Sequence, residues 1–296
     1  MRIGFVGTGT MGQLIAQCLM TAGHDLAVCD IRPEATATLA ARGAAVFGTA
    51  AAAANGAQVV FISLPGPKEV EEAMLAPQAG ILAGLQRGGV CIDLTTNAPT
   101  MIRRLADACD GCGVRFLDAP VSGRPPDMTV MVGGEVADFA ACRPLFEAIA
   151  RNVFHVGKSG AGCVAKLATQ YMGYSNFIAA LEGMLIAAKA GIDLDVLARI
   201  VPLSAGQSRT FDNIPRGVLN RSFAAGGTLD IIVKDVELAC ALAREVGAPA
   251  ALGRAASDLY KQAQAEGWGQ EGFPVVARLL ERMAGAELRV TEKNHD

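Results

Sequence analysis

The sequence predicts a doubly wound, mostly parallel α/β domain followed by an all-helical domain, with one long helix joining the two. Three observations lead to this fold class: a glycine-rich turn at the N-terminus, alternating strand-like and helical segments up to about residue 160, and helical segments alone thereafter. Such alternation is typical of a parallel sheet with helices on both faces. We expect the first domain over 1–160, the helical domain over 161–288 and a polar tail over 289–296.

The glycine-rich turn lies in residues 2–12, where an apolar strand runs into the spacing G-x-G-x-x-G. Gly7 permits a tight turn, Gly9 has no side chain to block a pyrophosphate, and Gly12 lets the next helix pack closely on the strand. Free backbone N–H groups at the start of that helix can bind phosphate oxygens. Asp30 closes the next apolar run, 18 residues after Gly12. This order indicates a Rossmann dinucleotide site rather than a glycine turn in another α/β fold.

The other elements follow from the same alternation. Strands are expected at 2–6, 25–30, 58–64, 90–93, 115–119, 129–132 and 153–156, with alanine-rich helical stretches between most of them. Helices are expected at 161–190, 193–202, 230–247, 250–266 and 274–284. The first of these helices is apolar on several faces and therefore favours burial all round. We expect a second subunit to cover part of it, in a homodimer or homotetramer.

Charge and composition exclude several classes of protein. A net charge of −3 without a basic stripe argues against nucleic-acid binding. Glu182 and Lys189 interrupt the best candidate for a membrane span, so we expect no membrane segment. No signal peptide precedes the first strand, which favours a cytoplasmic protein with reduced cysteines. Cys109 and Cys112 form a C-x-x-C pair without two further ligands at suitable spacing, so we predict no metal site.

Lysine rather than histidine is the candidate acid/base. His24, His155 and His295 have no evident aspartate partner in a loop. Lys166 instead lies within the long apolar helix, one turn after a Gly-Ala-Gly sequence. A lysine partly desolvated beside a cofactor has a lowered pKa and can exchange a proton near neutral pH. Most lysines on helices are solvated surface groups, however, and the residues alone leave both interpretations open.

Polar loops follow three of the predicted strands, at the edge where open α/β sheets bind ligands. Ser122 and the backbone N–H of Gly123 could hold a carboxylate, although an ordinary Pro/Ser/Gly loop has the same composition. Leu64, Pro65 and Thr96 lie where a cofactor would extend along the sheet edge. Hydroxyl groups in these loops can bond the ribose or the nicotinamide amide, or they can cap helices.

Together these segments resemble the β-hydroxyacid dehydrogenase family, which includes 3-hydroxyisobutyrate dehydrogenase. The similarity covers nearly the whole chain, and the family fold of a Rossmann domain followed by a helical domain agrees with the interpretation above. Seven motifs carry the resemblance: Gly7-Thr-Gly-Thr-Met-Gly12, Leu64-Pro65, Asp93-Leu-Thr-Thr96, Asp118-Ala-Pro-Val-Ser-Gly123, Met131-Val-Gly-Gly134, Gly157-Lys-Ser-Gly-Ala-Gly162-Cys-Val-Ala-Lys166 and Lys234-Asp235.

The resemblance implies a role for individual residues. Lys166 matches the catalytic lysine, which takes the hydroxyl proton while NAD accepts a hydride from the same carbon. Ser122 and Gly123 match binders of the substrate carboxylate, and Lys234 matches a lysine that reaches the site from the helical domain. The residues expected to contact the cofactor are Gly7, Thr8, Gly9, Thr10, Met11, Gly12, Asp30, Leu64, Pro65, Thr96 and Lys234.

Two departures from the family pattern fall on the substrate side. Gln170 stands four residues after the lysine, where the family usually has Asn, so the pocket depth should change. The loop that begins at Arg124-Pro125-Pro126 is shorter than usual by about five residues. We expect Gln170 and Arg124 to contact the substrate, with Arg124 binding a second anionic group. An ion pair between Arg124 and Asp127 that only holds the loop is equally compatible with the sequence.

Asp30 decides the expected cofactor. A carboxylate at this position accepts hydrogen bonds from the ribose diol and repels a 2′-phosphate, so we favour NAD over NADP, although Arg32 is close enough to pair with such a phosphate. The sequence thus predicts an NAD-dependent dehydrogenase of a small β-hydroxy acid, or a reductase of the matching semialdehyde. An NADPH-dependent aldehyde or imine reductase and a non-catalytic dinucleotide-binding protein are the alternatives.

Overall fold

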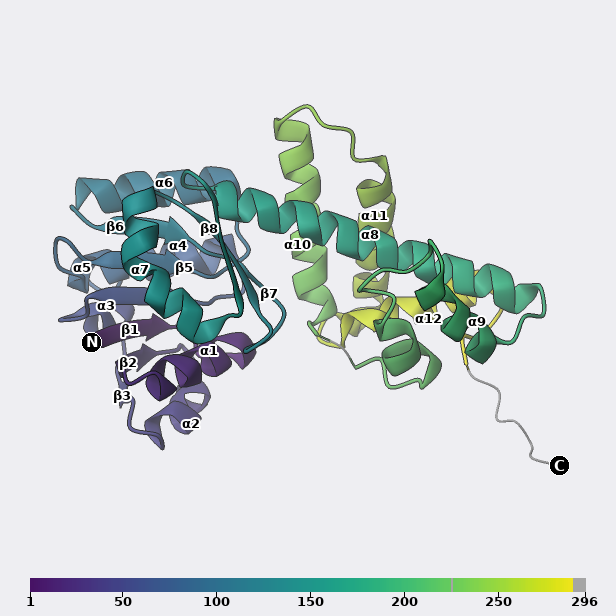
Figure 1. Ribbon diagram of the computed structural model, residues 1–296, viewed down its shortest axis with the longest axis horizontal. Coiled ribbons are helices and arrows are strands. Elements are labelled where there is room, and N and C mark those ends of the chain that lie inside the picture. The colour runs from purple at the N-terminus through teal and green to yellow at the C-terminus, as the bar shows by residue number, and fades with distance from the viewer. Residues whose placement is uncertain (225, 290–296) are drawn as a thin grey trace. The chain divides into compact units, whose positions relative to one another are not determined.

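The computed structural model describes residues 1–224 and 226–289. The chain divides into two compact units, one over Met1–Lys166 and one from Leu167 onward. Figure 1 shows the first unit in purple to teal and the second in teal to yellow. The first unit contains a sheet with helices on both faces, whereas the second consists of helices.

The sheet of the first unit has nine strands within the described residues, in the order β3-β2-β1-β4-β5-β6-β8-β7, with β9 paired to β8. The six strands from β3 to β6 are parallel. Strand β8 runs antiparallel to β6 and β7. The strands are β1 (Arg2–Val6), β2 (Asp25–Cys29), β3 (Ala45–Val46), β4 (Val59–Ile62), β5 (Val90–Asp93), β6 (Arg115–Asp118), β7 (Val121–Ser122), β8 (Thr129–Gly133) and β9 (Asn152–Gly157).

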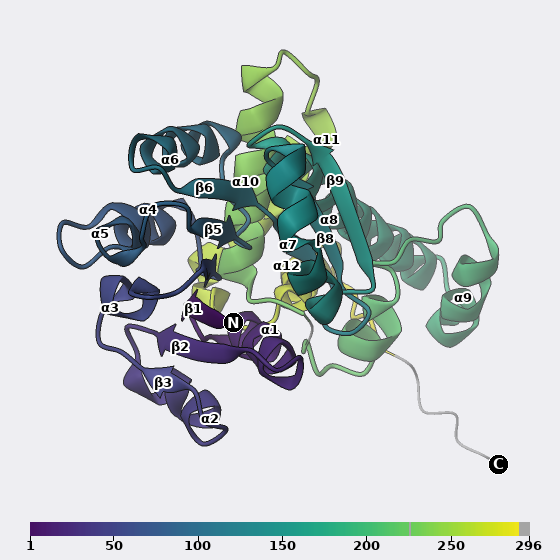
Figure 2. The same ribbon diagram turned by 60° about the vertical axis from the view of Figure 1, so that its left-hand side comes forward.

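Helices cover both faces of this sheet, because the strands are apolar on both sides (Figure 2). Helices α1 and α7 pack on one face around the stacked rings of Phe5 and Phe61. Helices α3 to α6 pack on the other face. The helices of this unit are α1 (Thr10–Thr21), η1 (Pro33–Thr36), α2 (Ala37–Ala40), α3 (Ala50–Ala54), α4 (Pro67–Leu75), α5 (Ile81–Gly84), α6 (Pro99–Gly111) and α7 (Val136–Ile149).

The strand order reverses between β1 and β4, which lie side by side in the sheet. The chain leaves β1 toward β2 and β3 on one side and returns to β4 on the other. Ligands of open α/β sheets bind outside the carboxyl ends of strands at such a point. The turn that begins at Gly7 follows β1 and the loop that begins at Ser63 follows β4, so both predicted cofactor segments lie at this edge.

Two glycines of the turn are required by the backbone itself. Gly7 has φ +89°, and a Cβ on it would lie 2.3 Å from the carbonyl oxygen of Ser63. A Cβ on Gly12 would lie 2.0 Å from the carbonyl oxygen of Gly7. Both contacts are with main-chain atoms that cannot turn away, so these two positions demand glycine before any ligand is considered.

The second unit packs helices around one aromatic core. Tyr174 and Phe177 contact the ring of Phe273 edge to face, and Tyr260 donates a hydrogen bond to the Tyr174 carbonyl. The elements after β9 are α8 (Ala161–Lys189), α9 (Leu194–Ile200), η2 (Val201–Leu203), η3 (Ile214–Leu219), α10 (Leu229–Glu245), α11 (Ala251–Ala263), η4 (Gln264–Trp268), η5 (Phe273–Val275) and α12 (Val276–Ala284).

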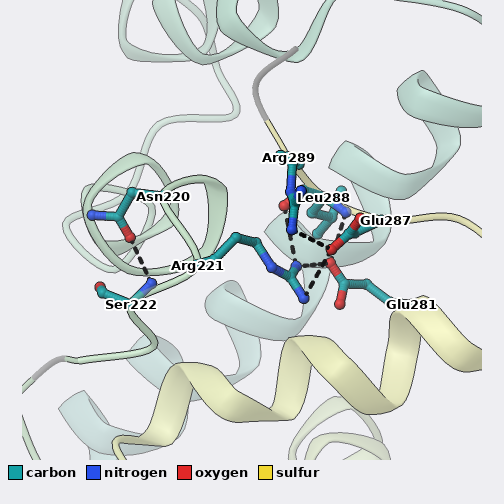
Figure 3. A network of polar contacts seen from close by, with 7 residues as sticks. All are labelled: Asn220, Arg221, Ser222, Glu281, Glu287, Leu288 and Arg289. Atoms are coloured by element: carbon teal, nitrogen blue, oxygen red, sulfur yellow. Dashed lines mark hydrogen bonds and ion pairs between the residues drawn. The ribbon is translucent and has the colours of Figure 1, made fainter. Parts of the chain in front are cut away.

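A polar network holds the segment after α12 against this unit (Figure 3). The Arg221 guanidinium contacts the carboxylate of Glu281, which is largely buried, and that of Glu287 at 3.3 Å. The same Glu281 carboxylate accepts the backbone N–H of Leu288 at 2.7 Å. The last described residues are therefore anchored by one buried glutamate on α12.

The longer strands, and the longer helices after residue 160, follow the order that the sequence predicts, whereas the helix η3 (Ile214–Leu219) is not predicted. Strands β3 and β7 have two residues each, and the sequence predicted neither. The helix expected over 250–266 is α11 followed by the separate π-helical turn η4. Among the described helices, none combines the length and apolarity needed to cross a membrane.

Helix α8 is not covered on every side by its own chain. Met172 is 55% exposed and Ile186 is 72% exposed, whereas Phe177 and Leu181 on the opposite side are fully buried. The second unit packs against one side of the helix, so its own chain covers the helix only in part, as is expected from the sequence.

Candidate active site

The first turn of α1 is built to receive an anion. Gly9 is the residue before the helix, and no side chain caps the N–H groups that follow it. These donors and the helix dipole favour a phosphate. A Cβ on Gly9 would meet no heavy atom closer than 3.6 Å, where the Arg32 guanidinium lies. Unlike Gly7 and Gly12, Gly9 therefore has space beside it within the chain.

Asp30 lies beside this turn and is held by it. Its Oδ2 accepts the backbone N–H of Thr8 at 2.7 Å and the Thr8 hydroxyl at 3.3 Å. Its Oδ1 accepts the backbone N–H of Arg32 at 2.9 Å, and the Arg32 Nε lies 3.8 Å away. The Asp30 side chain is 8% exposed and that of Arg32 is 62% exposed. The carboxylate thus occupies the inner position next to the glycine turn.

The ends of β4 and β5 are tied together by hydrogen bonds. The Thr95 hydroxyl accepts the backbone N–H of Leu64 at 3.1 Å, and the Thr95 N–H donates to Asp93 at 2.9 Å. Thr96 is half-buried and Pro65 is exposed at the same edge. The cofactor segments after β1, β4 and β5 accordingly meet at one edge of the sheet.

Two fully buried carboxylates lie below these loops, on neighbouring strands and in register. Burial raises the pKa of Asp93 to about 6, although hydrogen bonds from Thr95 and Asn97 favour its ionised form. Burial likewise raises the pKa of Asp118 to about 6, against hydrogen bonds from the backbone N–H groups of Gly160 and Cys163. From the sequence, neither residue is assigned a role beyond membership of a motif.

The raised pKa of Asp93 predicts a pH-dependent stability. Between about pH 4 and 6 Asp93 keeps its proton in the folded chain but has released it in the unfolded chain. The contribution of this proton to the free energy of unfolding is therefore largest below pH 3.8 and is lost as pH rises through about 6. Asp93→Asn removes this titrating group. Relative to wild type, the free energy of unfolding of the variant should therefore rise by up to about 3 kcal/mol between about pH 4 and pH 7. Urea unfolding across this range measures the difference, and parallel pH curves would contradict it.

Lys166 is the last residue of the first unit and is buried, with 6% exposure. The structure thereby excludes the solvated surface lysine that the sequence left open. Cys163, three residues earlier on α8, is also buried and its thiol lies 3.8 Å from the Thr95 carbonyl oxygen. The beginning of α8 is therefore attached to the same edge of the sheet as the cofactor loops.

The loop after β6 carries the predicted carboxylate site. Ser122, Gly123 and Arg124 are all exposed, and Gly123 has φ +85°. Asp127 forms an ion pair with Arg151 at 2.8 Å. The alternative in which Asp127 pairs with Arg124 is wrong for the described chain, because the closer partner lies on the segment that leads into β9.

In the second unit, Gln170 is held by a buried acid. Its Nε2 donates to Asp235 on α10 at 2.7 Å and to the Tyr174 hydroxyl at 3.3 Å. Asp235 is 3% exposed and pairs with Lys234 at 2.9 Å. Burial, followed by the charge of Asp235, raises the pKa of the Tyr174 phenol above its ordinary value. Asp235 could not be predicted as the partner of Gln170, because the two residues lie 65 positions apart in the chain.

A histidine of the sheet and the cysteines are the remaining candidate residues in the described chain. His155 bonds the Gly134 carbonyl oxygen at 2.8 Å through Nε2 and packs against Phe139, which is a structural role. All eight cysteines are free thiols. In the described part of the chain, no group of three or more potential ligands from His, Cys, Asp and Glu could hold a metal ion.

Comparison with known proteins gives matches over most of the chain. Residues 2–157 match the family described as the NAD binding domain of 6-phosphogluconate dehydrogenase, and residues 160–280 match the NAD-binding domain of NADP-dependent 3-hydroxyisobutyrate dehydrogenase. The mitochondrial 3-hydroxyisobutyrate dehydrogenase of Drosophila melanogaster is 33% identical, over 95% of this chain and 89% of that protein.

Two further relatives match this chain over almost their full length. The NAD-dependent L-serine dehydrogenase of Pseudomonas aeruginosa is 33% identical, over 96% of this chain and 99% of that protein. The structure of Mycobacterium tuberculosis 3-hydroxyisobutyrate dehydrogenase with L-serine matches with a TM-score of 0.85 and 29% identity, over 94% of this chain and 98% of that one.

Proposed function

The chain belongs to the β-hydroxyacid dehydrogenase family, and from this premise we propose that it is an NAD-dependent oxidoreductase of a small β-hydroxy acid, or of the matching semialdehyde in reverse. The observation that carries the proposal is the burial of Lys166 in the second turn of α8, a helix whose start is attached to the dinucleotide edge of the sheet. Few lysines are buried, because desolvating the charge is costly, and buried lysines occur with polar partners.

Lys166 acts as the general acid/base. In oxidation its amine takes the proton of the substrate hydroxyl, and in reduction it returns that proton to the developing alkoxide. Bound NAD supplies the hydride acceptor. Ser122 and the N–H of Gly123 hold the substrate carboxylate, which orients the hydroxyl-bearing carbon. Gln170, one helical turn after Lys166, and Lys234 contact the rest of the substrate, and Lys234 also contacts the cofactor.

Asp30 supports NAD over NADP. Its carboxylate is largely buried beside the glycine turn, where it accepts hydrogen bonds from the ribose diol and repels a 2′-phosphate. The Arg32 charge, which could pair with that phosphate, is partly neutralised by Asp30 itself. Repulsion of a 2′-phosphate by Asp30 also disfavours an NADPH-dependent imine or aldehyde reductase. The remaining cofactor contacts assigned from the sequence are Gly7, Thr8, Gly9, Thr10, Met11, Gly12, Leu64, Pro65 and Thr96.

Turnover assays test this function directly. The chain is incubated with NAD and, separately, NADP, and with 3-hydroxyisobutyrate, L-serine and short hydroxy acids that lack a β-hydroxyl, and nicotinamide absorbance is followed. We expect oxidation of β-hydroxy acids with NAD preferred in kcat/KM. NADH binding without turnover on the whole panel would instead favour a non-catalytic dinucleotide-binding protein.

We further propose that Arg124 binds a second anionic group of the substrate. The residue is exposed in the loop of the carboxylate binders, and Asp127 is paired elsewhere. Arg124→Ala should lower kcat/KM about tenfold for 2-(hydroxymethyl)glutarate, which has a second carboxylate, because a charge-assisted hydrogen bond is lost. 3-Hydroxyisobutyrate, which has one carboxylate, should be affected less. Equal losses on both substrates would reject this role.

We also propose that a second copy of the chain covers the exposed side of α8, giving a homodimer or homotetramer in the cytoplasm. Exposed Met172 and Ile186 on the side of α8 opposite the buried Phe177 and Leu181 support the assembly, and eight free thiols fit a reducing compartment. Light scattering, which measures the molar mass in solution, should show an oligomer for wild type and smaller species for the Met172→Glu and Ile186→Glu variants. A monomeric wild type would contradict the assembly.

A further inference from the structure

The start of α8 is held by a single carboxylate from the sheet. Asp118, the last residue of β6, accepts the backbone N–H of Gly160 through Oδ1 and that of Cys163 through Oδ2, each at 2.8 Å. Gly160 is the residue before the helix and Cys163 is the third residue within it. Both N–H groups lack a partner inside the helix, so Asp118 satisfies two of the donors that a helix start leaves open.

The arrangement resembles a capping box supplied by one side chain from another element. In a capping box the same two N–H groups are satisfied by two side chains of the helix itself. Here the helix has glycine at 160 and cysteine at 163, which cannot do so, and both oxygens of one acid replace them. A negative charge at this end of the helix also interacts favourably with the positive end of the helix dipole.

Two glycines enclose the carboxylate so closely that it has little freedom. A Cβ on Gly133 would lie 2.4 Å from Asp118 Oδ1, and a Cβ on Gly162 would lie 2.9 Å from Oδ2 and 2.4 Å from the Met131 carbonyl oxygen. The absence of side chains at 133 and 162 is what allows the acid to reach the helix. The position of the first turn of α8 relative to β6 and β8 is thus fixed.

Lys166 lies three residues after Cys163, on the same side of the helix and about one turn further. Its backbone position follows from the turn that Asp118 holds, since a helix is stiff over so short a distance. The Cys163 thiol contact with the Thr95 carbonyl ties this turn to β5 as well. All of these residues lie within the first unit.

We propose that Asp118 is a positioning residue for Lys166: it fixes the first turn of α8 against the sheet and thereby sets where the amine meets the substrate. The proposal rests on the acid/base role proposed for Lys166. Asp118 is fully buried, and no contact with substrate or cofactor is assigned to it. A carboxylate is needed because both oxygens accept, whereas asparagine would turn an N–H toward one of the two N–H groups.

Asp118→Asn tests this proposal. We expect kcat to fall about tenfold with the Kd for NADH unchanged, because a misplaced acid/base slows the chemical step alone. Amide hydrogen exchange at Gly160 and Cys163 should become faster. Thr49→Ala is the matched control, because it removes a helix cap of α3, where the Thr49 hydroxyl accepts the N–H of Ala52 at 3.1 Å. This control should lower Tm without changing kcat.

The outcomes separate this proposal from the proposed function. If wild type turns over and Lys166→Ala does not, but Asp118→Asn keeps full kcat, the positioning role is overturned and the function stands. A Kd for NADH that rises in parallel with the loss of kcat also overturns it. Should Asp118→Asn fail to fold, Asp118→Ser, which is smaller and keeps one acceptor, takes its place. Failure of both to fold makes Asp118 a stability residue and contradicts the proposal.

Discussion

Replacing Lys166 by alanine is expected to lower kcat by about 10²–10⁴-fold, the usual contribution of a positioned proton donor and acceptor. Lys166 is 6% exposed, so bulk water has little access to the residue to take over its task. NADH affinity should remain within about twofold of wild type, because the assigned cofactor contacts lie on the loops after β1, β2, β4 and β5 and on Lys234. Steady-state kinetics and nicotinamide fluorescence measure the two quantities.

A matched control lies on the same helix. Lys189 is exposed near the C-terminal end of α8 and donates to the Ala284 carbonyl oxygen at 2.8 Å. Lys189→Ala should leave kcat unchanged. Lys166→Arg keeps the charge, but a guanidinium does not release its proton near neutral pH, so this variant should be nearly as slow as Lys166→Ala. Full activity of either Lys166 variant would remove the basis of the proposed mechanism.

The sequence predicted those parts of the chain in which one local pattern determines the structure. The β1–α1–β2 unit follows from glycine spacing and an acid at a fixed distance, and it was found with strand ends correct to one residue. Strands β3 and β7 could not be found in the same way, because two residues show no periodicity and pair only where a neighbouring strand is already in place.

In the candidate site, too, residues marked by a local pattern could be predicted, and residues that act on distant partners could not. Lys166 stood out as a charge among apolar neighbours, but its burial depends on packing that a single sequence does not show. Asp118 and Asp235 act on partners 42–45 and 65 residues away, respectively, so no local pattern marks either one. One signal was available: apolar runs on neighbouring strands each end in an acid, at Asp93 and Asp118, and buried acids require partners.

Gly9→Ala is expected to weaken NADH binding by about 10- to 100-fold, which corresponds to about 1–3 kcal/mol for a methyl group forced into a close contact. The second glycine of the turn is where the backbone approaches the pyrophosphate. In the chain alone the same methyl group meets nothing closer than 3.6 Å. Gly9 has φ −64° and ψ −167°, a conformation open to alanine. The substitution should therefore affect the ligand and not the fold.

The stability of this variant distinguishes a blocked site from a damaged turn. Alanine reduces the conformational freedom of the unfolded chain, which stabilises the folded protein by about 0.4–1 kcal/mol. This gain offsets the loss that comes from alanine being a weaker N-cap residue than glycine. Tm should thus stay close to wild type while NADH affinity falls. Gly12→Ala is the contrast, because its Cβ would lie 2.0 Å from the Gly7 carbonyl oxygen and should lower Tm together with binding. If Gly9→Ala binds NADH as tightly as wild type, the pyrophosphate does not approach this turn, and the placement of the cofactor at the β1–α1 edge is wrong.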